Sequence, residues 1–420
     1  MISGVATMEI AMFVYEFPPR IVGGLGTYAM EISQQFIRMG HDVTVFTMND
    51  GNLPIRDVWQ GVEVHRPITT DISETFPSLL PPDVRRFGRG MRFFSDVFVY
   101  NILSVSTLVN ELLKEERRFD VVAGHDWLSI VGAVAAKQAM KKPLVFHVHS
   151  TEKGRTMGGG SRTIEHLEYR GGHEADLIVT VSHAMRDELA GMSFPADRLR
   201  VCWNGVDPSK YDSAKVDKER VQRLREKYKI TPDEIMILHV GRLTPVKGAD
   251  RLVQAMPHVL KSNPRAKLVI LGVGDMDKYL AELIKSLNLE NVVTLNLQFV
   301  PEDERILHYA ACDLAAFPSI YEPFGIVSLE AMSMGKPVVV GARGISGMRE
   351  QIIPSGPDQC GFHVNPLEPS DIAWGINCTL SDPSALKRLG ENARKRVLEY
   401  FTWEKVAQNT IGVYEELLAK

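Results

Sequence analysis

The chain has 420 residues, a length that suggests two or three domains with sizeable cores. Its residues are 45% apolar and 24% charged, and its net charge of −4 argues against a protein built to coat nucleic acid. We expect no integral membrane segment and no signal peptide, because no apolar run reaches spanning length and no basic segment opens the chain. The four cysteines are scattered without a C-x-x-C pair, which indicates reduced thiols in a cytoplasmic protein.

The first predicted elements are a buried strand over 9–15, a helix over 27–39 and a second strand over 41–47. Between the first strand and the helix lies a loop that contains Gly23, Gly24 and Leu25. Glycines there would let the backbone approach a ligand closely at the start of the helix. The local pattern alone favours an ordinary turn, because paired glycines are common in turns.

A basic segment follows, in which Arg85, Arg89 and Arg92 fall on one face of a predicted helix. The pattern favours a solvated helix face, and the alternative is a site for a phosphate-bearing acceptor. Apolar periodicity then predicts a long helix over 93–113.

Polar side chains follow two further predicted strands, over 120–123 and 144–148. The first strand runs into His125, Asp126 and Trp127, and the second ends at His149. Such polar clusters at strand ends are typical of the ligand site of an α/β sheet. Strand alternation puts His147 and His149 on the same side, so periodicity does not choose between them.

The segment 153–170 is rich in glycine and charge, and we expect a mobile loop that includes Lys153 and Arg155. In the second half of the chain, a predicted strand over 235–240 ends in Gly241, Arg242 and, five residues later, Lys247. A strand end, two cations and a helix start make a grip for a pyrophosphate. The Asp275-Met276-Asp277 string starts a helix, so we expect Asp275 to cap that helix and no metal to bind.

The most informative stretch runs from 318 to 337, where a predicted strand over 313–317 delivers a loop and then a helix over 326–334. Glu322 lies in the loop and Glu330 on the helix, eight residues later, which in a helix is a rise of roughly 12 Å. Carboxylates at that spacing suit the two ends of an elongated ligand. The amides of Phe324, Gly325 and Ile326 lie near the helix start and favour an anion. The alternative is a pair of solvated surface glutamates.

This stretch resembles the Glu-(seven residues)-Glu motif of retaining glycosyltransferases with the GT-B fold, and is most similar to family 4 and to the glycogen and starch synthases. The resemblance covers residues 9–345. It implies an α/β protein with two Rossmann-like parallel-sheet domains that face each other across a cleft. Residues 1–205 would form the acceptor domain, joined by a returning helix over 400–420, and residues 206–399 would form the donor domain.

The resemblance also implies roles for single residues. His149 would hydrogen-bond the transferring sugar, Glu322 would hold sugar hydroxyls, and Glu330 would hold the ribose. Arg242 and Lys247 would stabilise the leaving diphosphate without a metal. The other residues that it implies in donor binding are Gly23, Gly24, Leu25, Asp126, Gly241, Phe324, Gly325 and Ile326.

We therefore predict a retaining hexosyltransferase that uses UDP- or ADP-glucose, needs no cofactor and extends an α-glucan, as glycogen synthases do. One alternative is a sugar phosphate acceptor, as in sucrose-phosphate synthase, and a lipid phosphate is another. The cations that would then bind the phosphate are Arg85, Arg89, Arg92, Lys153 and Arg155. A protein of a different class would bind a nucleotide sugar without turnover. A glycoside hydrolase is disfavoured, because it has no use for Arg242 and Lys247.

Overall fold

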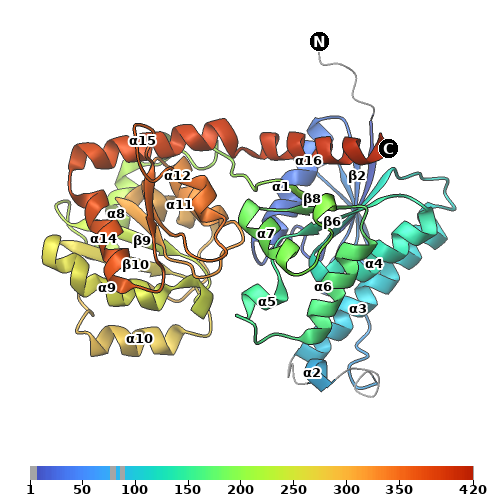
Figure 1. Cartoon of the computed structure of the whole chain (residues 1–420), viewed down its shortest axis with the longest axis horizontal. Helices are drawn as coiled ribbons and strands as arrows, with labels where there is room; N and C mark the ends of the chain where they lie inside the picture. Colours follow the sequence, from blue (N-terminus) through green and yellow to red (C-terminus); the bar gives the residue numbers. More distant parts are fainter. Residues whose placement is uncertain (1–6, 76–81, 86–89, 420) are drawn as a thin grey trace, which may run out of the picture. The chain divides into compact units, whose positions relative to one another are not determined.

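Alternating strands and helices build two sheets, one mostly parallel and one fully parallel, in two units of the chain (Figure 1). The computed structural model describes residues 7–75, 82–85 and 90–419. Unit 1 comprises residues 1–181, 186–203 and 403–420, and unit 2 comprises residues 182–185 and 204–402. The predicted fold class of two Rossmann-like α/β domains is confirmed.

The sheet of unit 1 has eight strands in the order β3-β4-β2-β1-β5-β6-β7-β8. All neighbours pair in parallel except β3 and β4, which form an antiparallel hairpin at one edge. The strands are β1 (Glu9–Phe13), β2 (Asp42–Phe46), β3 (Arg56–Trp59), β4 (Val62–His65), β5 (Val121–His125), β6 (Leu144–Val148), β7 (Leu177–Thr180) and β8 (Leu199–Val201). The central strands β5, β6 and β7 are buried at every position because helices cover both of their faces.

The helices of unit 1 include α16, which returns from the far end of the sequence and packs against α1. The helices of this unit, and α7, which begins in unit 2, are α1 (Gly24–Arg38), α2 (Pro82–Arg85), α3 (Gly90–Thr107), α4 (Asp126–Met140), α5 (Glu152–Arg155), α6 (Arg162–Glu174), α7 (His183–Gly191) and α16 (Trp403–Leu418). A π-helical turn, η2 (Leu108–Leu112), prolongs α3, and a 3-10 turn, η3 (Ala196–Arg198), precedes β8.

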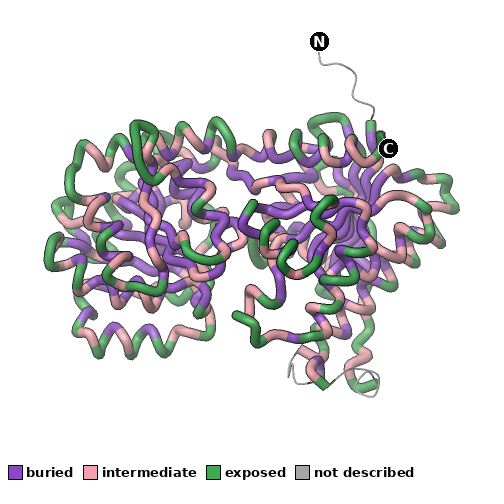
Figure 2. Tube along the Cα trace, in the orientation of Figure 1, coloured by how far each residue is buried: buried purple, intermediate pink, exposed green. Residues whose placement is uncertain are grey.

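The sheet of unit 2 has six parallel strands in the order β11-β10-β9-β12-β13-β14. They are β9 (Ile235–Val240), β10 (Ala266–Leu271), β11 (Val293–Asn296), β12 (Leu314–Phe317), β13 (Val338–Gly341) and β14 (Gly361–Val364). The helices are α8 (Lys218–Lys227), α9 (Ala249–Ser262), α10 (Asp277–Ser286), α11 (Glu302–Ala311), α12 (Ile326–Ser333), α13 (Met348–Gln351), α14 (Pro369–Leu380) and α15 (Pro383–Tyr400), with 3-10 turns η4 (Ser213–Lys215) and η5 (Pro245–Lys247). The strands inside both sheets are buried, the edge strands β3 and β11 are less so, and the outer helix faces are exposed (Figure 2).

Both sheets reverse their strand order at one point, and this point locates the ligand site of an open α/β sheet. In unit 2 the chain moves outward from β9 to β10 and β11, and then returns to β12 on the other side of β9. In unit 1 the corresponding reversal lies between β1 and β5. The loops that leave the carboxyl ends of these strands therefore carry the candidate site residues.

Two local expectations from the sequence are wrong. The segment 153–170 is not a loop throughout: α5 and α6 occupy its two ends, because Thr151 and Ser161 cap these helices with their side chains. Asp275 does not cap α10; instead Asp277 accepts a hydrogen bond from the Gly274 amide at 3.1 Å.

A third expectation, that no apolar run reaches spanning length, also needs correction. Within the described residues, the continuous helix Gly90–Leu112 is long and apolar enough to span a membrane by length and composition. Of the most apolar 18-residue stretch of this helix, 39% is buried. Asn101 on this helix donates to the Leu128 carbonyl at 2.8 Å and accepts from the Gly132 amide at 2.7 Å, so the helix is fastened to α4. These two bonds show that the helix packs on α4 within unit 1.

Two loops of unit 2 approach each other closely because of a glycine. Gly248 joins η5 to α9 with a φ of +70°, and a Cβ atom there would lie 2.1 Å from the Pro318 carbonyl oxygen. The neighbouring Ile320 amide donates to the Val246 carbonyl at 2.7 Å. The loop after β9 and the loop after β12 are thus held together at the reversal of the sheet.

We predict that Gly248→Ala destabilises unit 2 far more than Gly356→Ala. Gly356 also has a positive φ, +88°, but a Cβ atom there would meet no other atom within 4 Å. Gly356→Ala should therefore cost only the left-handed backbone penalty, about 1 kcal/mol. Gly248→Ala should cost about 1–3 kcal/mol more because the Pro318 loop must move. Denaturant unfolding of both variants measures the difference, and equal losses would contradict the close approach.

Candidate functional site

The loops that follow β9 and β12 bring a cation and a carboxylate together. The Lys247 Nζ donates to Glu322 Oε2 at 2.6 Å, and the Ser319 hydroxyl lies 3.3 Å from the same oxygen. Glu322 is held in place by its backbone, which accepts from the Gly347 amide at 2.8 Å and donates to the Ile345 carbonyl at 3.0 Å. Lys247 and Glu322, two predicted site residues with separate predicted roles, therefore contact each other directly.

Arg242 lies in the same loop as Lys247 and is exposed. Within the described part of the chain it makes no ion pair or side-chain hydrogen bond. Gly241, just before it, packs its carbonyl oxygen against Gly272, where a Cβ atom would lie only 1.9 Å away. The guanidinium of Arg242 is therefore available for a ligand, because it is exposed and has no partner within the described residues.

The start of α12 has the character of an anion site. Gly325 precedes the helix with a φ of +89°, and no side chain caps it. Among the described residues, the amides of Phe324, Gly325 and Ile326 make no backbone hydrogen bond. The Gln351 side chain instead holds the carbonyls of Phe324 and Gly325, at 2.8 and 3.2 Å. Orphan amides at a helix start favour negative charge.

Glu330 has a set of partners of its own. Its Oε1 accepts from the Tyr211 hydroxyl at 2.8 Å and from Arg305 Nη2 at 3.1 Å. Its Oε2 accepts from the Tyr309 hydroxyl at 2.8 Å and from Arg305 Nε at 3.2 Å. A carboxylate offers about four acceptor positions, so all are occupied. The ribose role of Glu330 stays a prediction, and it requires Glu330 to exchange one of these partners.

The protonation of Arg305 follows from this contact. Burial by itself lowers the pKa of Arg305, but the Glu330 carboxylate outweighs burial and raises that pKa above its usual value. Arg305 and Glu330 are therefore a charged pair in a half-buried setting, with side chains that are 24% and 7% exposed.

In unit 1 the residues after β5 and β6 are connected by one hydrogen bond. Asp126 opens α4 with a φ of +55°, a strained value for a residue other than glycine. Its Oδ1 accepts from the His149 amide at 2.7 Å. His149 is half-buried, and its ring lies 4.6 Å from the ring of Tyr28 on α1. The left-handed backbone of Asp126 thus accompanies a side-chain bond that holds the backbone of His149.

Three histidines form one cluster at these strand ends. His125 and His147 are directly paired in the sheet register, so their rings stack with centroids 4.4 Å apart. The Nδ1 of His125 lies 3.1 Å from the Nε2 of His149. Burial lowers the pKa of all three rings, and the pKa of His125 and of His147 falls well below the ordinary value. The cluster is therefore neutral at pH 7.

The glycine loop of unit 1 already binds an anion from the chain itself. The Glu16 carboxylate accepts from the amides of Val22 and Gly23 at 3.0 and 3.1 Å. Gly24 and Leu25 lie within the first turn of α1, which begins at Gly24 rather than at Thr27. A donor phosphate at Gly23 would have to replace Glu16, so the predicted contact with Gly23, Gly24 and Leu25 stays a prediction.

The cations predicted to bind a phosphate acceptor differ in their contacts and exposure. Arg155 donates to the Ser150 hydroxyl, pairs with the Glu152 carboxylate at 3.2 Å and lies 3.6 Å from the Glu168 carboxyl group. Arg92 pairs with Asp71 at 3.6 Å. Lys153 is exposed. Arg89 lies outside the described residues, and for Arg85 only the backbone, at the end of α2, is described.

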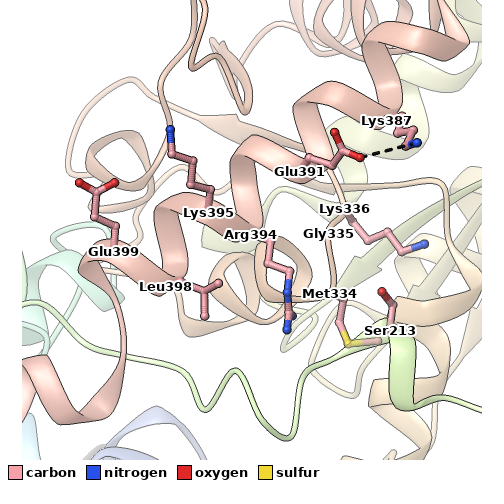
Figure 3. A pocket seen from close by; sticks show the side chains of 10 residues that line it. All are labelled: Ser213, Met334, Gly335, Lys336, Lys387, Glu391, Arg394, Lys395, Leu398 and Glu399. Carbon is pink, nitrogen blue, oxygen red and sulfur yellow. Dashed lines mark ion pairs between the residues drawn. The ribbon is translucent and has the colours of Figure 1, made fainter.

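The large open pocket of unit 2, about 720 Å³, lies away from these loops and is lined partly by α15 (Figure 3). Two of its cations have structural roles. Lys336 donates to the carbonyls of Ala310 and Cys312 at 3.0 and 2.7 Å, and Arg394 bonds the carbonyls of Tyr211 and Ser333. These contacts satisfy the backbone where α11 and α12 end, so Lys336 and Arg394 are already engaged within the protein.

Sequence reasoning missed the residues that surround Glu330 and His149. Arg305, Tyr211 and Tyr309 come from other elements, and no local pattern marks them as partners of Glu330. His125 stands out in the sequence, but its bond to His149 depends on the register of β5 and β6. The signal that the sequence offers is a histidine at the carboxyl end of each of two successive predicted strands, His125 for one and His149 for the other.

We predict that Glu330→Ala destabilises unit 2 as well as changing ligand binding. The variant leaves the half-buried Arg305 without its carboxylate, a loss of about 3–5 kcal/mol. Glu302 offers a matched control, because it also contacts the Tyr211 hydroxyl, at 3.2 Å, but its side chain is 47% exposed. Glu302→Ala should cost less than about 1 kcal/mol in urea unfolding, and similar losses for the two variants would be inconsistent with the Glu330 network.

We also predict a pH-dependent effect of Glu168→Gln in unit 1. Burial raises the pKa of Glu168 to about 8, although Arg155 opposes the shift. The folded state then holds a proton that the unfolded state releases above its ordinary pKa, so wild-type stability falls as pH rises from the ordinary value toward 8. Glu168→Gln should be more stable than wild type at pH 8.5 by on the order of a few kcal/mol, and less so at pH 5. Glu165→Gln on the same helix is the control; parallel pH curves for all three proteins would refute the shift.

Comparisons with known proteins identify the family of the chain. A family model described as Glycosyltransferase Family 4 matches residues 22–210, and one described as Glycosyl transferases group 1 matches residues 220–396. An uncharacterised glycosyltransferase of Methanocaldococcus jannaschii is 35% identical over 414 residues, which are 97% of this chain and 98% of that protein.

A glycogen synthase of Mycobacterium tuberculosis is 29% identical over 424 residues, with 97% of this chain and 94% of that protein covered. Among solved structures, sucrose-phosphate synthase of Thermosynechococcus elongatus has a TM-score of 0.77 at 22% identity, with 98% and 99% of the two chains covered. That likeness concerns the fold. The chain therefore belongs to the family 4, glycogen synthase-like glycosyltransferases of the GT-B fold.

Proposed function

We propose that this glycosyltransferase transfers glucose from UDP- or ADP-glucose to an α-glucan, with retention of configuration at the anomeric carbon. The observation that carries the proposal is the contact of Lys247 with Glu322 at 2.6 Å, where the strand order of unit 2 reverses. A cation suits the diphosphate of the donor, and a carboxylate beside it suits the hydroxyls of the attached sugar.

The chemistry places new charge on the leaving group. The bond from the anomeric carbon to the diphosphate oxygen breaks, the acceptor hydroxyl forms the new bond, and its proton is released. Arg242 and Lys247 neutralise the charge that develops on the nucleoside diphosphate, so we propose that transfer needs no metal ion. The orphan amides at the start of α12 add partial positive charge.

His149 takes the role of a hydrogen-bond partner for the transferring hexose. Its neutral ring supports this role, because burial lowers its pKa and a neutral imidazole donates one hydrogen bond. Asp126 supports it as well, through its bond to the His149 amide. Glu330 would bind the ribose hydroxyls by exchanging Tyr211 or Tyr309.

We propose an α-glucan as the acceptor rather than a sugar phosphate, and the contacts of one predicted phosphate ligand support this choice. A phosphate acceptor would need cations that are not already paired, and Arg155 is held by Glu152 and Glu168. The similarity to a glycogen synthase over nearly the whole chain supports the same choice. The four free cysteines fit a reducing compartment, so we propose that the reaction takes place in the cytoplasm.

A donor and acceptor screen tests the proposal. UDP-glucose and ADP-glucose are each combined with glycogen, fructose 6-phosphate and glucose 6-phosphate, with and without a chelator, and the product is identified by mass and by anomeric NMR coupling. We expect an extended α-linked glucan that forms equally well with chelator. A phosphorylated disaccharide, or hydrolysis of the donor alone, would overturn the acceptor assignment.

We predict that Arg242→Ala lowers kcat by about 100- to 1,000-fold, the usual effect of removing one donor to a developing charge. Because Arg242 is exposed and unpaired in the described chain, the melting temperature of the variant should not change. Lys261→Ala, which replaces an exposed lysine on α9, is the control and should retain full activity. A near-normal kcat for Arg242→Ala would remove the assignment to the diphosphate.

A further inference from the structure

His125 and His149 share a hydrogen bond with good geometry. Their rings are inclined by only 21°, and their centroids are 5.4 Å apart. That separation is about the 3.1 Å distance from Nδ1 to Nε2 plus one ring radius at each end. The rings therefore meet edge to edge in nearly one plane, which points the N–H of one ring at the lone pair of the other.

The cluster is not arranged to hold a metal ion, although the three histidines offer nitrogen atoms within 4.8 Å of one another. The three ring planes are nearly parallel, with mutual angles of 15–23°. A ring nitrogen lone pair lies in the plane of its ring. His125 and His149 face each other in nearly one plane, whereas His147 lies in a parallel plane stacked on His125, so the three lone pairs do not converge on one point. A zinc ion needs convergent nitrogens at roughly 2.0–2.1 Å.

Two proton arrangements are possible for the neutral pair. Either His125 carries its proton on Nδ1 and donates to His149, or His149 carries its proton on Nε2 and donates to His125. The second arrangement puts the proton of His125 on its own Nε2. That atom is buried and has no hydrogen-bond partner among the residues that the structure describes.

The two arrangements differ in what is left unpaired. The first leaves only a bare lone pair at His125 Nε2, whereas the second leaves a buried N–H without an acceptor, which is the rarer and costlier defect in proteins. We propose that His125 is a positioning residue: its Nδ1–H donates to His149 Nε2 and thereby fixes the proton of His149 on Nδ1.

The consequence for His149 follows from the tautomer. In a neutral histidine, the hydrogen bond made by one ring nitrogen decides whether the other nitrogen carries the proton. His149 then presents a permanent Nδ1–H donor to its ligand and has no free lone pair, so it acts as a donor to a sugar oxygen and not as a general base. This consequence rests on the proposed function, but the tautomer itself does not.

The groups that surround the pair leave the arrangement neutral. His147 stacks on His125 and bonds the Tyr414 hydroxyl of α16 at 2.8 Å, and Tyr28 of α1 packs on His149. The nearest carboxylate, that of Asp126, accepts from the backbone of His149. None of these neighbouring groups donates to, or accepts from, the ring nitrogens that share the proton.

Nitrogen NMR of histidine-labelled protein without substrate tests the tautomer directly, with signals assigned by His149→Gln. We expect protonated nitrogen shifts for Nδ1 of His125 and Nδ1 of His149, and an unprotonated shift for Nε2 of His149. A protonated Nε2 on His149 would overturn the proposal. This measurement does not depend on activity, so an inactive protein with the expected shifts would refute the proposed function alone.

Two variants of His125 then test its effect on transfer. His125→Asn keeps an N–H in the place of Nδ1, whereas His125→Leu has the same branching without a donor. We expect kcat of the Leu variant to fall about tenfold or more, with the Asn variant restoring it to within about threefold of wild type. Equal losses in two folded variants would show that His125 only fills space. If the Leu variant does not fold, the Asn variant and the wild-type spectrum still decide.

Discussion

The contact between the Lys247 ammonium and the Glu322 carboxylate is the interaction on which the candidate site depends. It joins two loops that leave neighbouring parallel strands, at 2.6 Å, and Glu322 is only 6% exposed. The contact exists because Gly248 lets the backbone of one loop lie against Pro318 of the other. A larger residue at Gly248 would separate the charges, and the sheet reversal would no longer be lined by a cation and a carboxylate.

The remaining charged groups of the site fall into two kinds. Glu330 and Arg155 are saturated by neighbours before any ligand arrives, whereas Arg242 and the amides that begin α12 are unused within the described chain. The saturated groups hold loops and helices in place. The unused groups are those that can take up the negative charge of a ligand without rearrangement, and such preorganisation is what electrostatic catalysis requires.

Much of the fold could be predicted, because apolar runs mark strands and a glycine marks the end of a helix in the local sequence. Arg242, Lys247 and Glu322 could be chosen because each follows a buried strand. Partners at long range could not be predicted: Tyr211 lies 119 residues from Glu330, and only the packing of the segment before η4 against α12 brings its hydroxyl to the carboxylate. The prediction of a loop over 153–170 is wrong because the glycines of that segment obscure the two capping residues, Thr151 and Ser161.

A crystal structure of the protein with UDP-glucose or ADP-glucose tests the central claim most directly. The account predicts the diphosphate within hydrogen-bond distance of Arg242 and Lys247, with hexose hydroxyls on Glu322. A donor whose phosphates are bound elsewhere, with Lys247 still paired to Glu322 and Arg242 still in solvent, would contradict it.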